Sequence, residues 1–202
     1  MIPPTSWAEA LELRAHADAD GEVIRRVGGP SISAGRLLED ALAMAGSMST
    51  VVGTGTGTVV ATACSSGPAA ATLTTAISWL GAIELPIPTA LDPGVARQLM
   101  DAGSVVLTVA SPARLAAEPH LIQLGESIGV STMTVDGRWE GLAAVTDRTG
   151  PRPARRRASL GDPTAIMVTS GTGGRPKGAL LCNGVGIRSG PTCLQRHGVR
   201  HR

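Results

Sequence analysis

Short apolar runs alternate with segments of helical period along this chain, and this alternation constrains its fold more than any other feature. Runs typical of buried strands lie at residues 58–63, 83–87, 104–109, 130–135 and 164–168. Segments with helical spacing of apolar residues lie at residues 7–17, 33–45, 68–82, 92–101 and 112–127. Strands that alternate with helices form parallel sheets, because each helix carries the chain back across the sheet. The sequence therefore predicts an α/β fold with a largely parallel sheet flanked by helices.

Several of the expected helices begin with a residue that favours this position. Ser6, Ser33 and Asp92 precede their helical segments, and their side-chain oxygens can accept hydrogen bonds from the free N–H groups of the first turn. Pro68 and Pro93 suit a first turn, because no N–H donor is needed there. These residues set where we expect the helices to begin.

The segment from Ala41 to Ile83 contains no charged residue, so a membrane span has to be considered. Stretches rich in glycine, serine or proline at residues 53–57 and 65–68 interrupt it. The remaining pieces are shorter than the roughly 20 continuous apolar residues that a span requires. We predict a buried strand followed by a buried helix, and no transmembrane segment.

Composition argues against several other classes of protein. The net charge is +2, and neither Phe nor Tyr occurs, so we expect no module that binds nucleic acid by stacking on bases. The cysteines are Cys64, Cys182 and Cys193, and their spacing is not that of metal ligands. We therefore expect reduced thiols and no metal site. No signal peptide is visible at the N-terminus, so we expect a cytoplasmic protein.

A glycine-rich segment follows the last apolar run and is the candidate site. It reads Thr169-Ser170-Gly171-Thr172-Gly173-Gly174-Arg175-Pro176-Lys177-Gly178. Its glycines let successive backbone N–H groups point into one concavity and bind an anion. Thr169, Ser170 and Thr172 add hydroxyl donors, and Lys177 adds a positive charge suited to phosphate. The segment therefore predicts a phosphate-binding loop.

Other interpretations of the glycine-rich segments fit less well. A Walker A loop ends in Gly-Lys-Ser/Thr, whereas Arg175 and Pro176 separate Gly174 from Lys177. Residues 53–57 have the spacing G-x-G-x-G, whereas the dinucleotide fingerprint G-x-G-x-x-G places its third glycine one position later, and no acidic residue follows about 20 positions on. We predict a turn before a strand there. A flexible surface loop would explain the glycines, but it would not explain why hydroxyl residues, a proline and a lysine follow one another in this order in the candidate site.

In its residue order, the candidate loop resembles the phosphate-binding signature of the adenylate-forming (AMP-binding) superfamily. Members of this superfamily include acyl-CoA synthetases, firefly luciferases and the adenylation domains of peptide synthetases. Their pattern is close to T-S-G-T-T-G-x-P-K-G, and this chain departs from it at Gly173, where the family usually has Thr or Ser. A weaker resemblance covers residues 53–61 and 80–88. Together the matches imply the partial N-terminal domain of an acyl-CoA synthetase or fatty-acid–CoA ligase.

The resemblance also implies a reaction, that of an ATP-dependent acid–CoA ligase. In this reaction a small-molecule carboxylate attacks the α-phosphorus of ATP with the help of Mg²⁺, pyrophosphate leaves, and the thiol of coenzyme A then displaces AMP. The residues that would hold the β- and γ-phosphates are Thr169, Ser170, Gly171, Thr172, Gly174 and Lys177. Gly173 would contribute a backbone N–H alone. No residue of the chain matches a catalytic acid or base of the family, and the acid substrate stays open.

The chain ends soon after this loop. We expect residues 1–186 to form a truncated N-terminal portion of an AMP-binding domain. Residues 187–202 are basic and interrupted by glycine and proline, and we expect them to form an irregular tail, which we hypothesise to be out of frame. We therefore expect this chain alone to be inactive. The alternatives are a non-catalytic module that binds nucleotide phosphate or a partner, and an oxidoreductase that uses residues 53–57.

Two further groups of charged or titratable residues have simpler explanations. Residues 155–157 are three arginines, with Arg152 nearby, and we predict a solvated connection there rather than a phosphate or RNA patch. His16 and His120 lie apart from each other on expected helices, and we predict surface or capping roles for both.

Overall fold

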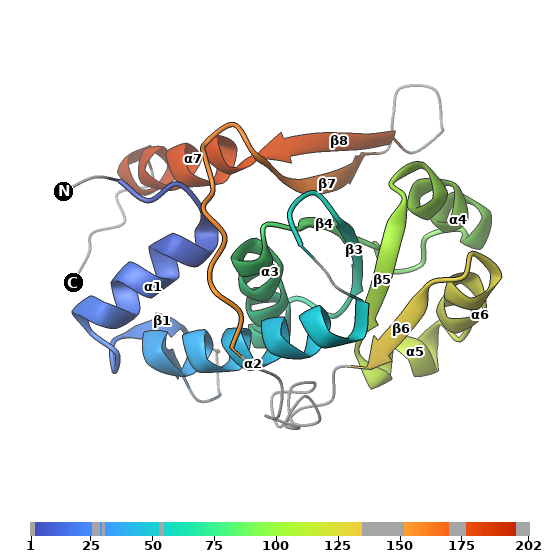
Figure 1. The fold of residues 1–202 in the computed structure, drawn as a ribbon, viewed down its shortest axis with the longest axis horizontal. Coiled ribbons are helices and arrows are strands. Elements are labelled where there is room, and N and C mark those ends of the chain that lie inside the picture. Colours follow the sequence, from blue (N-terminus) through green and yellow to red (C-terminus); the bar gives the residue numbers. More distant parts are fainter. Residues whose placement is uncertain are drawn as a thin grey trace.

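A sheet with helices on both faces forms the body of the protein (Figure 1). The computed structural model describes residues 3–25, 29, 31–52, 55–134, 152–169 and 177–196. Among these residues, six strands form the main sheet in the order β6-β5-β3-β4-β7-β8. They are β3 (Val59–Ala63), β4 (Ile83–Pro86), β5 (Val105–Ala110), β6 (Ser131–Thr134), β7 (Pro163–Thr169) and β8 (Lys177–Cys182). All neighbours pair in parallel except β7 and β8, so the predicted α/β fold with a largely parallel sheet is confirmed.

The helices and a small hairpin complete the described structure. The helices are α1 (Trp7–Ala17), α2 (Ala34–Val52), α3 (Pro68–Leu80), α4 (Pro93–Ala102), α5 (Pro112–Ala117), α6 (His120–Ser127) and α7 (Asn183–Arg196). The hairpin joins β1 (Glu22–Ile24) and β2 (Ile32–Ser33). Within the described residues, none of the helices combines the length and apolar character that a membrane crossing needs.

The predicted helix starts are confirmed by their hydrogen bonds. Ser6 Oγ accepts a hydrogen bond from the backbone N–H three residues on, at 3.2 Å. Ser33 Oγ and Asp92 Oδ1 accept equivalent bonds, at 3.3 and 3.1 Å. Pro68 and Pro93 occupy the first turns of α3 and α4. Local sequence therefore sets where these helices begin.

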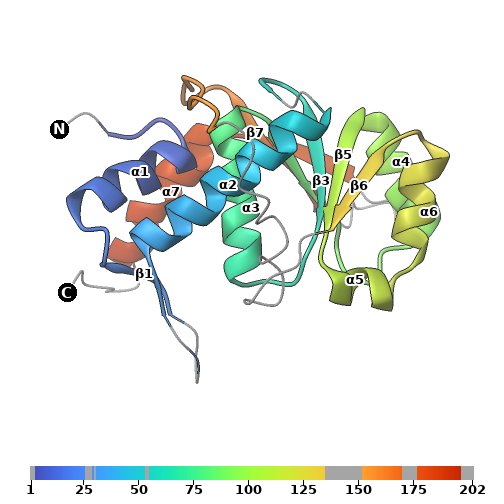
Figure 2. The ribbon, with the colours of Figure 1, turned by 60° about the horizontal axis from the view of Figure 1, so that its bottom comes forward.

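One face of the sheet is covered by α2 and α3, with α1 outside them (Figure 2). Met44 and Met48 of α2 and Leu73 and Ile77 of α3 pack in one buried cluster with Val60 of β3. Each of these side chains is no more than 1% exposed. Within the uncharged segment from 41 to 83, β3 and α3 are the buried strand and buried helix that its interrupted apolar pattern predicts.

The other face is covered by α4 and α6 (Figure 2). Met100 of α4 and Leu121 and Leu124 of α6 pack there with Ala61 of β3 and Leu85 of β4. Neighbouring residues of β3 belong to opposite clusters, because successive side chains of a strand point to opposite faces. Both faces of the central strands are therefore buried, which is the usual state of parallel sheets.

The bounds of two helices differ from the prediction. The segment 112–127 forms two helices, because Glu118 precedes Pro119 and a residue before proline is restricted away from the helical region. Glu118 has φ −135° and ψ 69°. The helix expected to end near Ala45 continues as α2 to Val52, since Gly46 lowers helix propensity by only about 1 kcal/mol.

Two elements near the end of the described chain were not predicted. No element was assigned to residues 177–182, which form β8 and pair antiparallel with β7. The expectation of an irregular tail over 187–202 is wrong for residues 187–196, which belong to α7. This helix contacts α1, and tertiary contacts of this kind override the low intrinsic propensity of glycine and proline. Residues 197–202 lie outside the described residues.

Candidate functional site

The candidate phosphate loop joins the last two strands of the sheet. Thr169 is the last residue of β7, and Lys177 is the first residue of β8. The two residues pair directly across the hairpin, and Thr169 Oγ1 donates a hydrogen bond to the Lys177 carbonyl at 3.3 Å. Both residues are exposed. The structure thus brings the two ends of the predicted site together at the surface.

The remaining predicted site residues lie outside the described residues. They are Ser170, Gly171, Thr172, Gly173 and Gly174. Their roles as phosphate ligands therefore stay predictions from the sequence. The described ends set one condition on them, because residues 170–176 have to connect two backbone positions that lie opposite each other.

The loop leaves the sheet at an edge where ligands commonly bind. β7 runs parallel to β4, and Glu84 pairs with Ala165 in register. The end of β7 at Thr169 is therefore a carboxyl end, on the same edge as the carboxyl ends of β3, β4 and β5. In open α/β sheets, ligands bind outside this edge. The position of the loop agrees with the phosphate-binding role predicted from its residues.

Gly178 has a packing role that differs from the predicted backbone freedom. A Cβ atom at this position would lie 2.7 Å from Ile166 Cγ2 on β7. Such a contact is closer than real Cβ atoms make, so a side chain at position 178 would require Ile166 or the strand to shift. The last glycine of the motif therefore serves the hairpin that carries the loop.

Lys177 is the only lysine in the sequence. It is exposed at the start of β8, next to the loop. Its ammonium group is a point charge that can bind phosphate. A reagent that modifies primary amines can therefore label this protein at Lys177 and at the N-terminal amine alone.

A buried carboxyl group lies in the strand next to β7. Glu84 of β4 is 8% exposed, and its Oε1 and Oε2 accept hydrogen bonds from Thr62 Oγ1 (2.9 Å) and Thr74 Oγ1 (2.8 Å). Burial raises the pKa of Glu84 above its ordinary value, and the bonds from Thr74 and Thr62 oppose that shift. This group was not predicted from the sequence, although Glu84 is the single acidic residue inside the apolar run 83–87, which is a signal of it.

A second buried charge holds the loop that follows β4. Arg114 is 5% exposed, and its Nη2 donates to the carbonyls of Ile87 (3.2 Å) and Pro88 (2.7 Å). The same Nη2 donates to Glu118 Oε2 at 3.1 Å. The backbone N–H of Ala90, and with it the Arg114 guanidinium, lowers the pKa of Glu118. Because both charges are paired and bonded to backbone, we assign them a structural role.

Cys64 follows the end of β3 and is poorly suited to chemistry. Burial raises the pKa of its thiol to about 11, so the reactive thiolate is scarce near neutral pH. Among the described residues, no three or more His, Cys, Asp or Glu side chains form a group that could hold a metal ion. His16 is exposed, whereas His120 is half-buried and its Nε2 has no hydrogen-bond partner among the described residues.

The arginine-rich segment is in part the solvated connection that the sequence predicts, because Arg152, Arg156 and Arg157 are exposed, but Arg155 is not. Arg155 forms ion pairs with Glu12 (2.7 Å) and Glu9 (3.4 Å) of α1, and its side chain is 24% exposed. Trp79 Nε1 of α3 donates to the Pro153 carbonyl at 2.8 Å. The segment therefore packs across α1 and α3 and joins them to the strand that carries the loop.

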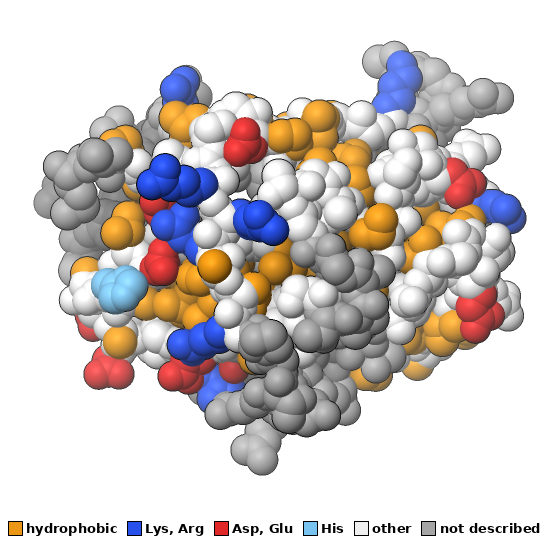
Figure 3. Space-filling model, in the orientation of Figure 1, with side chains coloured by type: hydrophobic (Ala, Val, Ile, Leu, Met, Phe, Trp, Pro, Cys, Tyr) orange, Lys and Arg blue, Asp and Glu red, His pale blue; other side chains and the backbone are white. Residues whose placement is uncertain are grey.

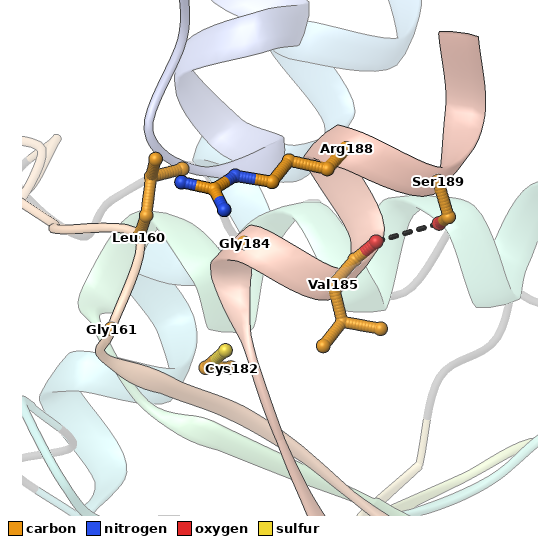
Figure 4. A pocket seen from close by; sticks show the side chains of 7 residues that line it. All are labelled: Leu160, Gly161, Cys182, Gly184, Val185, Arg188 and Ser189. Atoms are coloured by element: carbon orange, nitrogen blue, oxygen red, sulfur yellow. Dashed lines mark hydrogen bonds between the residues drawn. The ribbon is translucent and has the colours of Figure 1, made fainter. Parts of the chain in front are cut away.

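A cavity of about 650 Å³ lies at the far end of the β7–β8 hairpin (Figure 4). Its lining consists of Leu160, Gly161, Cys182, Gly184, Val185, Arg188 and Ser189. Arg188 extends toward Leu160, and Ser189 Oγ donates to the Val185 carbonyl at 2.6 Å (Figure 4). Cys182 pairs with Pro163 at the start of β7, so the length of the strands separates this cavity from the loop. We do not assign it to the phosphate site.

Comparison with protein families gives one match over most of the chain. Residues 11–188 match the family model described as AMP-binding enzyme, and this range includes the candidate loop. Comparison with curated proteins gave no match.

Solved structures share the fold. The complex of VinN with L-aspartate is 14% identical, has a TM-score of 0.79, and the match covers 98% of this chain and 50% of VinN. A candidate long-chain-fatty-acid CoA ligase from Rhodopseudomonas palustris is 21% identical, with a TM-score of 0.74 and coverage of 95% and 48%. ATP-bound MatB from Rhodopseudomonas palustris is 23% identical, with a TM-score of 0.73 and coverage of 92% and 37%. The chain thus spans half or less of the length of these three proteins.

Proposed function

Because the chain belongs to the AMP-binding enzyme family, we propose that it binds ATP at the loop between β7 and β8 and takes part in the adenylation of a carboxylic acid. The observation that carries this proposal is the residue order of the motif from Thr169 to Gly178, together with the pairing of its described ends, Thr169 and Lys177, at the carboxyl edge of the sheet. The ATP-bound state of one matched structure, MatB, supports the choice of nucleotide.

The proposed role of the loop is to stabilise negative charge. In the first step, a carboxylate oxygen forms a bond to the α-phosphorus of ATP, and the bond from that phosphorus to the pyrophosphate oxygen breaks. Groups held in place around the β- and γ-phosphates stabilise the leaving charge. The proposed ligands are the hydroxyls of Thr169, Ser170 and Thr172, the Lys177 ammonium, and backbone N–H groups of Gly171, Gly173 and Gly174.

The finer parts of the proposal rest on family membership. Coenzyme A is the proposed thiol for the second step, a fatty acid is one proposed substrate class, and the cytoplasm is the proposed location. Mg²⁺ is the metal of the family, but the described residues offer no cluster of acidic, His or Cys side chains for it. We therefore assign no step to a metal held by side chains of the described chain.

Nucleotide binding tests the proposal directly. We expect the purified chain to bind ATP in calorimetric titration, and Lys177→Met to weaken binding about 10- to 100-fold, as expected for loss of a charged hydrogen bond. Arg25→Met is the matched control, because it removes an exposed positive charge on the β1 hairpin. It should leave the dissociation constant unchanged. Equal ATP affinity of the wild type and Lys177→Met would contradict the proposed site.

Lysine chemistry gives an independent readout. An ATP acyl-phosphate probe, which transfers its acyl group to a nearby amine, should modify Lys177 in preference to the N-terminal amine. Peptide mass spectrometry locates the label, and excess ATP should suppress it. Labelling of both amines to the same extent, without protection by ATP, would count against binding at the loop.

Catalysis is tested separately from binding. Exchange of labelled pyrophosphate into ATP, with a panel of fatty, aromatic and amino acids, reports acyl-adenylate formation. Exchange that depends on one acid class supports the ligase and names its substrate. Binding that is lost in Lys177→Met, without exchange for any acid, would favour the alternative of a non-catalytic module that binds nucleotide phosphate.

A further inference from the structure

The turn that follows β4 lies beside the candidate phosphate loop. Glu84 of β4 pairs in parallel with Ala165 of β7. Four residues further along each strand come Pro88 and Thr169, so these two positions are level with each other at the carboxyl edge of the sheet. Neighbouring strands of a sheet are about 4.8 Å apart. The residues just after Pro88 are therefore next to the point where the loop leaves β7.

Two buried charged side chains hold this turn in place. Arg114 and Glu118 are both buried and are bonded to each other. Besides its bonds to two backbone carbonyls, Arg114 donates from Nη1 to Thr89 Oγ1 at 2.9 Å. Glu118 Oε1 accepts a hydrogen bond from the backbone N–H of Ala90 at 3.0 Å. One ion pair thus fixes both the side chain and the backbone of the turn.

The backbone of the turn has a conformation that residues other than glycine disfavour. Ala90 has a φ of 58°, in the left-handed region, where a Cβ atom comes too close to the following carbonyl oxygen. Such strain persists only where the surrounding structure fixes it, and it is concentrated at functional sites. Burial of an ion pair also costs desolvation. Two unfavourable features therefore meet at the edge of the sheet that carries the candidate loop.

The side chain that the ion pair holds at the surface is that of Thr89. Thr89 is exposed, and its Oγ1 accepts from the Arg114 guanidinium, so its own hydrogen stays available. Within the described parts of the chain, this hydrogen has no acceptor. A hydroxyl that accepts from a cation becomes a better donor, because hydrogen bonds in a chain polarise one another. The phosphate oxygens of ATP at the neighbouring loop are charged acceptors that suit this donor.

A second group of side chains could also attract phosphate. Figure 3 shows Lys and Arg side chains gathered where residues 152–157 cross α1 and α3. Arg156 lies against Gly81, because a Cβ atom on Gly81 would be 3.3 Å from Arg156 Cβ. Gly81 follows α3 and precedes β4, so this segment lies at the amino edge of the sheet. It is separate from Thr89 and supplies control positions.

We propose that Thr89 donates a hydrogen bond to the phosphates of ATP bound at the loop between β7 and β8. Arg114 and Glu118 are positioning residues that hold this hydroxyl beside the loop. The inference rests on the proposed function and adds to it a phosphate ligand that lies outside the motif.

Calorimetric titration of the purified chain with ATP tests the contact. Thr89→Val keeps the size of the side chain and removes the hydroxyl, so it should weaken ATP binding about 10-fold, as expected for a hydrogen bond to a charged group. Thr89→Ser keeps the hydroxyl and should bind ATP as the wild type does. Inorganic pyrophosphate lacks the nucleoside, and Thr89→Val should weaken its binding by the same factor. A loss with ATP but not with pyrophosphate would overturn the phosphate contact.

Thr56→Val is the matched control, because Thr56 is an exposed threonine before β3, at the amino edge. Arg157→Met, in the arginine-rich segment, is the control for binding at that edge. Both variants should leave the affinities for ATP and pyrophosphate unchanged. A loss in either control as large as that in Thr89→Val would overturn the proposal.

A double-mutant cycle tests the positioning role. Arg114→Lys keeps the charge, but an ammonium lacks the planar fork that bonds the turn and Glu118 at once. It should weaken ATP binding about 10-fold, and adding Thr89→Val should cause no further loss, because both changes remove the same contact. Losses that multiply to about 100-fold would overturn the positioning role. Circular dichroism checks folding, and if Arg114→Lys does not fold, the comparison of Thr89→Val with Thr89→Ser decides.

This inference and the proposed function can fail separately. If Lys177→Met weakens ATP binding and Thr89→Val does not, the site at the loop stands and the role of Thr89 is overturned. Equal losses in Thr89→Val and Thr89→Ser would also overturn it. A wild type that does not bind ATP would overturn both.

Discussion

Glu84 is a residue whose chemistry depends on its surroundings rather than on its neighbours in sequence. Thr62 lies on the adjacent strand and Thr74 on the helix above, and each donates to one oxygen of the carboxyl group. Burial favours the neutral acid and raises its pKa. A group with a raised folded pKa stabilises the fold at low pH, and this contribution is lost as the pH rises through that value.

Glu84→Gln should therefore change how stability depends on pH. Glutamine keeps the size of the side chain and cannot ionise, and its amide nitrogen donates, so one of the two threonine hydroxyls has to accept a hydrogen bond instead of donating one. From about pH 4.3, the ordinary value for glutamate, the wild type should lose stability relative to the variant, by up to about 1.4 kcal/mol per pH unit until the raised pKa is passed. Urea denaturation across this range measures the difference. Glu39→Gln, which changes an exposed glutamate of α2, should show the same pH dependence of stability as the wild type. If the stability of Glu84→Gln also ran parallel to that of the wild type across this range, the raised pKa of Glu84 would be refuted.

At the scale of residues, the site was partly predictable. Thr169 and Lys177 were identified from the order of residue types in the motif, and the structure pairs them across the hairpin. The packing role of Gly178 could not be derived in this way, because it depends on Ile166, which becomes a neighbour only when β7 and β8 pair. Glu84 was likewise missed, since its two hydrogen-bond donors come from other elements.

At the scale of elements, the segment before β7 ties distant helices together. Arg155 bonds to two glutamates of α1, and the carbonyl of Pro153 accepts from Trp79 of α3. Periodicity predicted α1 and α3, but the contacts between them and this segment span more than 70 residues of sequence. The exposed Arg152, Arg156 and Arg157 agree with the predicted solvated connection, whereas the pairing of Arg155 with α1 could not be predicted from the local sequence.

Arg155→Met should loosen the attachment of α1. The side chains of the ion pairs are about a quarter exposed, so we expect a loss of about 1 kcal/mol rather than the larger cost of a fully buried pair. Urea denaturation measures the total loss, and hydrogen exchange should show faster opening of α1 than of α3. Arg157→Met is the control, because Arg157 is exposed and makes no ion pair or hydrogen bond with other described residues. Equal losses in both variants would contradict the role of the ion pairs.

The missed elements share a cause. β8 is a short run after a glycine-rich loop, and α7 contains glycines and a proline, so neither has a strong local signal. β8 exists because β7 supplies its hydrogen bonds, and α7 contacts α1. Segments with a strong apolar period, such as α2 and α3, could be predicted without knowledge of their tertiary contacts. The boundary between α5 and α6 was missed for a different reason, because the effect of Pro119 on Glu118 was overlooked.

At the scale of the whole molecule, aliphatic side chains supply almost all of the buried core. The largest fully buried side chains are methionine, leucine, isoleucine, valine and threonine. Two apolar clusters lie on opposite faces of β3 and β5, and they depend on close packing rather than on large aromatic rings. Removal of a single aliphatic side chain from either cluster should therefore affect the stability of the whole fold.

Leu73→Ala tests this dependence. Leu73 is 0% exposed in the cluster between α2 and α3, and we expect a loss of about 2–5 kcal/mol from the lost contacts and the cavity left behind. Thermal and urea unfolding followed by tryptophan fluorescence measure the loss. Leu13→Ala, at a leucine that is 45% exposed, should cost less than about 1 kcal/mol. A loss for Leu73→Ala as small as that for Leu13→Ala would contradict the packed core.

The sequence by itself determined the class of the fold, the helix starts and the motif of the candidate loop. Each of these depends on residue types at short range, such as alternating apolar runs, capping side chains and the order from Thr169 to Gly178. Only the tertiary structure decided the strand order, the antiparallel pairing of β8 with β7 and the helical structure of residues 183–196 in α7. It also decided the surroundings of Glu84 and Arg155. These features depend on partners distant in sequence, because pairing and burial are set by what the folded chain brings together and not by local propensity.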